Sequence, residues 1–318
     1  MKESIDRAES IPAFLVEAVE AAYGADDARR ALEGMRDAAE RPVTLRANTL
    51  KATADEVARA LDRASIAYER CPWYEEAFVL DAVRERAVWD LDIYRDGKVY
   101  LQSLSSMLPP LALKPRPDAD ILDMCAAPGG KTSQMAALLG GAARLTACEM
   151  NGPRAEKLTY NLAKLDARNV QVMHCDARKL DTFFSFDQIL LDAPCTGSGT
   201  MRAGDARAAR HMDARSLERS TRAQRALLDR ALRVLKPGGE LLYSTCSILP
   251  AENEEQVATA LARHRDCEIV PIALEGDWET LPCGIEGALV VCPSREFEGF
   301  FMAKMRKSAK PGNRARRS

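Results

Sequence analysis

Short apolar segments alternate with longer amphipathic ones through the last two thirds of the chain. The short segments are typical of buried parallel strands, and those between them carry apolar residues at helical spacing. Such alternation predicts a parallel sheet with right-handed helical crossovers. The predicted strands are 120–124, 144–149, 170–176, 186–193 and 240–246, with a closing pair at 288–292 and 298–305, and the predicted helices are 131–139, 153–165, 217–235 and 252–264.

The first hundred residues have a different pattern, with two helices followed by a strand, a helix and an extended segment. Thr53 and Glu56 stand at the spacing of a capping box, which predicts a helix start. The predicted elements are helices 11–22, 26–39 and 53–65, a strand at 43–50 and an extended segment at 68–80. We therefore expect an N-terminal α+β module over 1–98, an α/β domain over 99–306 and a basic, disordered tail over 307–318.

The glycine turn after the first strand of the α/β domain predicts a ligand site. A strand ending at Met124, a turn containing Gly129 and Gly130, and a helix after it allow the backbone to approach a ligand closely. A P-loop would require a glycine where Cys125 stands, so that phosphate-binding motif is incomplete. A nucleoside pocket instead requires an acidic residue about 20 positions later. Glu149, at the end of the next predicted strand, meets this requirement.

Polar residues stand at the carboxyl ends of the five predicted parallel strands. Because ligands of such sheets lie at that edge, these residues are expected to form one site. Carboxylates there are poor partners for a phosphate, which favours a nucleoside ligand. The residues are Asp123, Glu149, Asp176, Asp192 and Cys246.

Two thiols, Cys195 and Cys246, follow strands that can be neighbours in such a sheet, so both are expected to face one cleft. Cysteine is otherwise among the most buried residue types and usually only packs. We give that interpretation to Cys148, Cys175, Cys267, Cys283 and Cys292.

The composition is typical of a globular protein, with 47% hydrophobic and 29% charged residues in 318. No apolar run has the length of a membrane helix, and the N-terminus lacks the apolar region of a signal peptide. The nine cysteines include no C-x-x-C pair, so neither a disulfide framework nor a metal site is indicated. We expect a cytoplasmic monomer with reduced thiols.

The net charge of −2 conceals a basic segment at 201–236, with ten Arg or Lys against four Asp or Glu. Because this excess follows the thiol loop, we expect a surface for a polyanion there, with Arg202, Arg207 and Arg210 as candidate RNA-binding residues. The end of the chain, from Lys304, adds seven basic residues and no acidic one.

Four motifs in this order resemble the Nol/Nop/Sun family of RNA cytosine-C5 methyltransferases. They are Asp123–Thr132, Asp192–Cys195, Ser244–Ser247 and Glu252–Glu254; residues 41–51 and 101–107 are similar to the bacterial RsmF-type branch. The resemblance implies a Rossmann-like class I methyltransferase domain with a seven-stranded, mostly parallel sheet behind a small RNA-recognition-like domain. It also implies S-adenosylmethionine as methyl donor and RNA as partner.

The resemblance implies a role for each thiol. Cys246 is expected to add to C6 of the cytosine, which makes C5 nucleophilic, and Cys195 is expected to assist resolution of the covalent adduct. Asp192 is expected to hold the cytosine amino edge or to line the donor pocket, and Lys131 to neutralise charge on the base or on the donor carboxylate.

The same resemblance implies the donor-binding residues. Glu149 is expected to bind the ribose hydroxyls and Asp176 the adenine edge, and Arg154 either joins the donor site or forms a surface salt bridge. The residues expected around the methionine moiety are Cys125, Ala126, Ala127, Pro128, Gly129, Gly130 and Lys131, with Asp192 beside them.

The target RNA remains open at this stage. Ribosomal RNA is favoured, but larger RsmF-type relatives carry further RNA-binding material after the catalytic domain, and short relatives also act on tRNA. A tRNA methyltransferase is therefore one alternative. A non-catalytic ribosome-assembly factor that binds RNA is another, although a binding module would need neither thiol.

Overall fold

The computed structural model describes residues 11–142 and 144–309. Most of the predicted basic tail, residues 310–318, lies outside this range. The helices are α2 (Ala13–Asp37), α3 (Ala54–Arg63), α4 (Glu85–Trp89), α5 (Asp92–Arg95), α6 (Leu104–Leu113), α7 (Gly130–Leu138), α8 (Gly152–Lys164), α9 (Ala206–Ala209), α10 (Ala214–Val234) and α11 (Glu254–Arg263), with the 3-10 turns η1 (Ala38–Glu40), η2 (Ala177–Lys179), η3 (Ser198–Thr200) and η4 (Pro250–Glu252). The described helices are too short or too polar to span a membrane.

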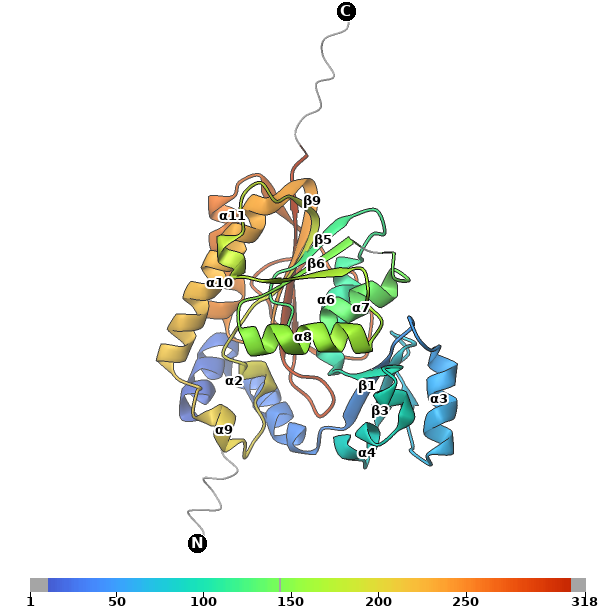
Figure 1. The fold of residues 1–318 in the computed structure, drawn as a ribbon. Helices are drawn as coiled ribbons and strands as arrows, with labels where there is room; N and C mark the ends of the chain where they lie inside the picture. Colours follow the sequence, from blue (N-terminus) through green and yellow to red (C-terminus); the bar gives the residue numbers. More distant parts are fainter. Residues whose placement is uncertain (1–10, 143, 310–318) are drawn as a thin grey trace, which may run out of the picture.

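Two sheets organise the described residues (Figure 1). The smaller has the order β2-β3-β1-β4, and the larger has β11-β12-β13-β9-β8-β5-β6-β7, with β10 also paired to β13. The strands are β1 (Val43–Ala47), β2 (Glu69–Arg70), β3 (Ala77–Leu80), β4 (Val99–Leu101), β5 (Asp120–Asp123), β6 (Arg144–Glu149), β7 (Val170–His174), β8 (Phe186–Asp192), β9 (Leu235–Thr245), β10 (Cys267–Val270), β11 (Thr280–Leu281), β12 (Leu289–Val291) and β13 (Phe300–Lys307).

The α/β fold class with a mixed, mostly parallel sheet is confirmed. Five neighbouring strands, β7-β6-β5-β8-β9, run parallel, and β13 pairs antiparallel with β9. Within the described residues the sheet has nine strands, not the predicted seven. The additional strands β10 and β11 lie at sheet edges and span only four and two residues. Edge strands that short have no sustained alternation of apolar residues, so the sequence pattern does not predict them.

Successive residues of the central strands supply the cores on the two faces of the large sheet, because side chains in a strand alternate. On β8, Ile189 and Leu191 belong to the core that also contains Leu227 and Leu228 of α10. Leu190, between them, belongs to the opposite core, to which α6, α7 and α8 contribute. Each strand therefore buries both faces, as expected of a parallel sheet.

The small sheet is antiparallel, and α3 covers it with Val57 and Leu61. The predicted capping box begins α3: Thr53 accepts a hydrogen bond from the Glu56 amide, and Glu56 accepts one from the Thr53 amide at 2.8 Å. β4, which pairs with β1, lies just beyond the predicted boundary at residue 98.

Helix α2 packs with the large sheet rather than with the small one. Its two halves are separated at Gly24, whose φ of 72° is non-helical, and both halves contribute residues such as Leu15 and Leu32 to the core of the larger domain. In Figure 1 the first half of this helix lies on the side of α9 and α10, and its second half runs toward β1. Packing therefore divides the chain differently from the predicted 1–98 module, because an amphipathic pattern does not show which sheet a helix covers.

A buried arginine joins the small sheet to the larger domain. Arg46 on β1 is 0% exposed and donates to Gln102 Oε1 at 3.1 Å and to Ser133 Oγ of α7 at 3.0 Å. Gln102 in turn donates to Gln134 Oε1 at 2.9 Å. Its partners among the described residues are neutral, and burial lowers the pKa of Arg46. The two domains are thus connected by a buried polar network.

We expect Gly34→Ala to destabilise the fold. A Cβ at Gly34 would lie 1.8 Å from the carbonyl oxygen of Pro293, and a backbone atom cannot rotate away. Overpacking of this kind costs about 1–3 kcal/mol, measurable as the free energy of unfolding in urea. Gly152→Ala is the matched control, because its Cβ would make an ordinary 3.5 Å contact with the His174 ring. Equal stability of the two variants would contradict the close packing of α2.

Candidate active site

The register between β8 and β9 brings the two predicted thiols together. Asp192 pairs with Ser244 across these parallel strands, so the loops that follow them leave the sheet side by side. Cys195 Sγ and Cys246 Sγ lie 3.1 Å apart, and both side chains are partly buried. The hydrogen bond with Cys246, together with burial, raises the pKa of Cys195. Cys195 is therefore held as a neutral thiol.

A buried carboxylate, Glu252, fixes the loop that carries Cys195. It accepts from the Thr196 amide at 2.8 Å and from the Thr196 hydroxyl at 2.6 Å. Gln224 on α10 donates to the same carboxylate at 3.2 Å. From the sequence, Glu252 was assigned to a motif only, since no sequence pattern predicts the burial of an acidic residue.

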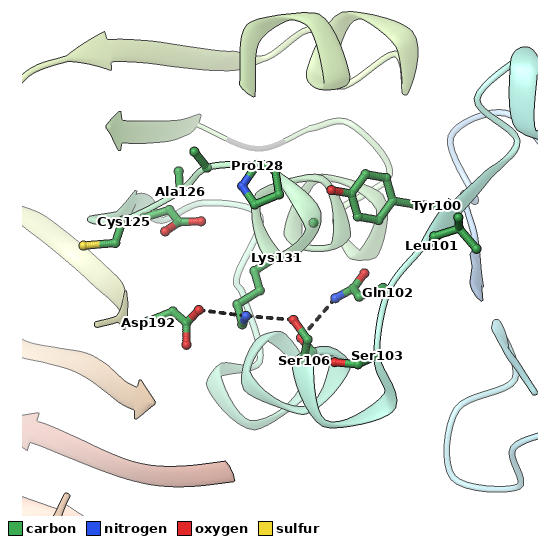
Figure 2. Close-up of a pocket in the computed structure, with 13 residues that line it drawn as sticks. Tyr100, Leu101, Gln102, Ser103, Ser106, Cys125, Ala126, Pro128, Lys131 and Asp192 are labelled. Atoms are coloured by element: carbon green, nitrogen blue, oxygen red, sulfur yellow. Dashed lines mark hydrogen bonds and ion pairs between the residues drawn. The ribbon is translucent and has the colours of Figure 1, made fainter. Parts of the chain in front are cut away.

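Lys131 and Asp192 form an ion pair next to the thiols. Lys131 Nζ lies 2.8 Å from Asp192 Oδ2 and donates to Ser106 Oγ at 2.7 Å, while Ser244 donates to Asp192 Oδ1 at 2.9 Å (Figure 2). Burial alone would lower the pKa of Lys131, but the Asp192 carboxylate outweighs it and the pKa is raised. Lys131 is therefore a fixed ammonium. Ser106, at the start of α6, was not predicted.

Asp123, at the end of β5, is the buried carboxyl of the site. Its side chain is 1% exposed; Oδ2 accepts from the Thr132 hydroxyl at 2.6 Å, and Oδ1 has no partner among the described residues. Burial raises the pKa of Asp123 to about 6, while the Thr132 hydrogen bond opposes this and the Asp192 charge adds to it.

The predicted donor loop lines a cavity of about 220 Å³ between the two domains. Gly129, with φ of 109°, turns the chain into α7, and a Cβ on Gly130 would lie 2.9 Å from the Tyr100 ring. Figure 2 shows the loop from Cys125 to Lys131 opposite residues of β4 and α6. The lining residues are Tyr100, Leu101, Gln102, Ser103, Ser106, Asp123, Cys125, Ala126, Ala127, Pro128, Gly130, Lys131 and Asp192.

The contribution of β4 to this cavity is the main feature that the sequence did not predict. Tyr100, Leu101 and Gln102 come from the last strand of the small sheet and the residue after it, so one wall belongs to the small domain. Residues 101–107 were noted as similar to the RsmF-type branch, but this similarity did not predict a role for them in the cavity.

Glu149 and Asp176 lie at the predicted strand ends and Arg154 lies in the first turn of α8, and none of the three lines this cavity. Glu149 is almost fully buried and accepts from the Asn151 amide at 2.9 Å. Arg154 lies 3.4 Å from Glu149 and donates to the Ala127 carbonyl at 2.9 Å, so it ties the donor loop to β6. Asp176 forms a two-pronged ion pair with Arg178, which lowers the pKa of Asp176.

The three predicted RNA-binding arginines, Arg202, Arg207 and Arg210, are exposed and also lie outside the cavity lining. The amide of Ala203 donates to the Met35 carbonyl at 3.1 Å, which places this segment beside α2.

We expect Asp123→Asn to remove a pH dependence of stability. The folded state favours protonated Asp123, because its pKa is about 6 against an ordinary 3.8, so stability from this group is present below pH 4 and is lost as the pH rises to 6. The shift corresponds to roughly 3 kcal/mol. Urea unfolding at several pH values would show the variant gaining stability relative to the original chain between pH 4 and 7. A constant difference across that range would contradict the raised pKa.

Two family models match separate parts of the chain. Residues 110–306 match the family model described as 16S rRNA methyltransferase RsmB/F, and residues 11–85 match the ferredoxin-like domain of RsmF/B-like methyltransferases. Ribosomal RNA small subunit methyltransferase F from Shewanella loihica is 36% identical over 275 residues, covering 84% of this chain and 56% of that protein. The protein of the same name from Aeromonas salmonicida is 34% identical over 277 residues, covering 83% of this chain and 57% of that protein. The chain thus spans a little over half the length of these relatives.

Solved structures agree with the fold. A methyltransferase homolog protein from Pyrococcus horikoshii is 33% identical, with a TM-score of 0.77 over 96% of this chain and 95% of that one. NSun6 from the same organism, solved with SFG, has a TM-score of 0.81 at 23% identity, covering 95% of this chain and 100% of that one, which supports the fold alone. Together with the matched family model, which spans more than half of the sequence, these findings show that the chain belongs to the RsmB/F methyltransferase family.

Proposed function

We propose that this chain transfers a methyl group from S-adenosylmethionine to C5 of a cytosine in RNA, with ribosomal RNA as the favoured substrate. One observation carries the proposal: Cys195 and Cys246 lie 3.1 Å apart, next to the Lys131–Asp192 ion pair, at the carboxyl edge of the sheet. Membership of the RsmB/F family supports it.

The residues present fit S-adenosylmethionine, which when bound supplies an electrophilic methyl group. Gly130 lines the cavity with its bare backbone, against which the Tyr100 ring packs, and the buried Asp123 Oδ1 is an unused acceptor at the cavity wall. The donor loop from Cys125 to Lys131 would hold the methionine moiety, and Lys131 would face its carboxylate or the target base. Glu149 would bind the ribose hydroxyls, and Asp176, whose orientation is held by Arg178, would bind the adenine edge.

Arg154 supports the donor site through its neighbours. It binds the Ala127 carbonyl and Glu149 at once, so it holds the loop and the ribose-binding carboxylate in fixed relation. These two contacts support the prediction of a donor-site residue, and the ion pair with Glu149 accounts for the salt bridge.

Cys246 is the proposed nucleophile. Its sulfur, after losing a proton, would form a bond to C6 of the cytosine, and the electron pair of the C5=C6 bond would move to C5. Cys195 remains a thiol because its pKa is raised, so it can donate a hydrogen bond to the Cys246 sulfur. This division of roles explains why the two thiols are adjacent.

Resolution requires two bond cleavages. Once C5 is methylated, its proton would pass to a water molecule. The electrons of the C5–H bond would then restore the double bond as the C6–S bond breaks and Cys246 leaves as a thiolate. Cys195, 3.1 Å away, is placed to return a proton to that thiolate. Asp192, held by Lys131 and Ser244, would accept a hydrogen bond from the cytosine amino group. The base must be unpaired for attack at C6.

We expect methyl transfer from labelled S-adenosylmethionine to appear as 5-methylcytidine after digestion of the RNA to nucleosides. Undermethylated small-subunit ribosomal RNA and total tRNA would be offered separately, with partly assembled small subunits as a third substrate. Label from the ribosomal substrates alone is the expected result. Label from tRNA alone would redirect the substrate assignment, and binding of RNA without label in any substrate would support an assembly factor instead.

The two thiols are separable by mutation. We expect Cys195→Ala to accumulate a covalent protein–RNA adduct that survives denaturing electrophoresis, because addition proceeds but resolution does not. Cys246→Ala should form neither adduct nor product, with a loss of at least about 10³-fold in rate. Cys267→Ala, on edge strand β10, is the matched control and should behave as the original chain. An adduct in Cys246→Ala would contradict the assignment of the nucleophile.

A further inference from the structure

A second hollow continues from the donor-loop cavity along α8. This cavity, of about 150 Å³, lies between β4 and α8 and shares the residues Tyr100, Leu101 and Pro128 with the first. Its remaining lining includes Lys157, Asn161 and Lys164 of α8, and none of its lining residues is acidic. The two cavities therefore adjoin at these three residues, and the second is positively charged.

Aromatic rings and ammonium groups meet in this groove. Lys164 Nζ lies 3.8 Å from the centroid of the Tyr94 ring, a cation–π contact. Tyr160, one turn before Lys164 on α8, is 67% exposed, which is unusual for a side chain of that size. Nothing in the donor site uses these rings.

A third cavity, of about 290 Å³, lies on the small domain and is also lined by positively charged residues. Lys51, Arg59, Arg63 and Lys98 line it, with Glu56 as the single acidic lining residue. Glu56 is already engaged by the Thr53 amide in the capping box. Within the described residues, Arg59 and Arg63 form no ion pair.

Lys51 connects the second and third cavities. Its Nζ donates to the Lys164 carbonyl at 3.1 Å, so two ammonium-bearing residues lie together at the junction. Burial and the nearby Lys51 charge lower the pKa of Lys164. The Asp96 carboxylate lies 3.8 Å from Lys98, so part of the positive charge of this cluster is balanced. An anionic ligand would relieve the repulsion between the two lysines.

We propose that these residues form the path of the single-stranded RNA that flanks the target cytosine. The path, called here the α8 track, comprises Tyr94, Tyr160, Lys157, Lys164, Lys51, Lys98, Arg59 and Arg63. This inference rests on the proposed function and adds to it a route for the strand on the side opposite the predicted arginines at 202–210.

Single-stranded RNA is favoured over a duplex by the chemistry of the track. Exposed rings can stack on bases only when the bases are unpaired, and cations placed between the rings can follow the phosphates. Such binding must depend on salt, because each phosphate contact releases counterions. Tyr100 and Pro128 line both cavities, so the track begins next to the proposed reaction site.

The test is binding of a fluorescent oligocytidylate of about 12 nucleotides, a length that single-strand grooves accommodate. We expect the double variant Arg59→Ala with Lys157→Ala to bind at least about fivefold more weakly at moderate salt, and its slope of log K against log salt to fall by about 1.4. Tyr160→Ala should also lose about fivefold or more, with an unchanged slope. Thermal unfolding would verify that each variant is folded.

The matched control is Arg116→Ala with Arg265→Ala, which removes two exposed positive charges at the opposite edge of the large sheet. It should bind the oligonucleotide as the original chain does. Equal affinity of the original chain and the Arg59/Lys157 variant for the oligonucleotide would contradict the proposed RNA path along the track. So would an equal loss in the Arg116/Arg265 control, because the effect would then reflect net charge alone.

If the proposed function is wrong and the track is right, the result would differ from both outcomes above. The original chain would then bind the oligonucleotide through the track but transfer no methyl group to any RNA. If both proposals hold, the Arg59/Lys157 variant should show a raised KM for RNA with kcat nearly unchanged, since the track does not touch the reacting atoms.

Discussion

A buried guanidinium sets the relation between the two domains. Arg46 is removed from water yet has only neutral hydrogen-bond partners among the described residues. Burying such a charge is costly unless its hydrogen bonds are satisfied, which requires Gln102 and Ser133 to stay in place. Ser133 belongs to α7, the helix that begins at the donor loop. The small sheet is therefore fixed to the element that shapes the ligand cavity.

This constraint explains why the cavity has a wall from each domain. With Arg46 in place, β4 lies against the donor loop, and Tyr100 packs on Gly130 where any larger residue would collide with its ring. The same arrangement positions α8 beside the small domain. Donor site and charged groove are consequences of one interface, and neither domain could form them alone.

The sequence predicted the elements of the larger domain well, because strand–helix alternation and strand-end residues follow directly from burial. It also placed Cys195 and Cys246 on strands that prove to be neighbours. It did not predict the roles of Tyr100, Ser106 and Glu252, whose importance comes from contacts with residues distant in the chain. The packing of helix α2 on the large sheet was likewise not predicted, since its apolar stripe fits either sheet.

The pairing of Asp192 with Ser244 has a consequence for how the protein loses order. Both thiols are attached to the central strands β8 and β9, which are buried on both faces and are the kind of segment that opens last in native-state hydrogen exchange. A slip of one residue between these strands would turn every side chain to the other face and separate the thiols. The spacing between the two sulfur atoms thus depends on the pairing of two strands that are buried on both faces.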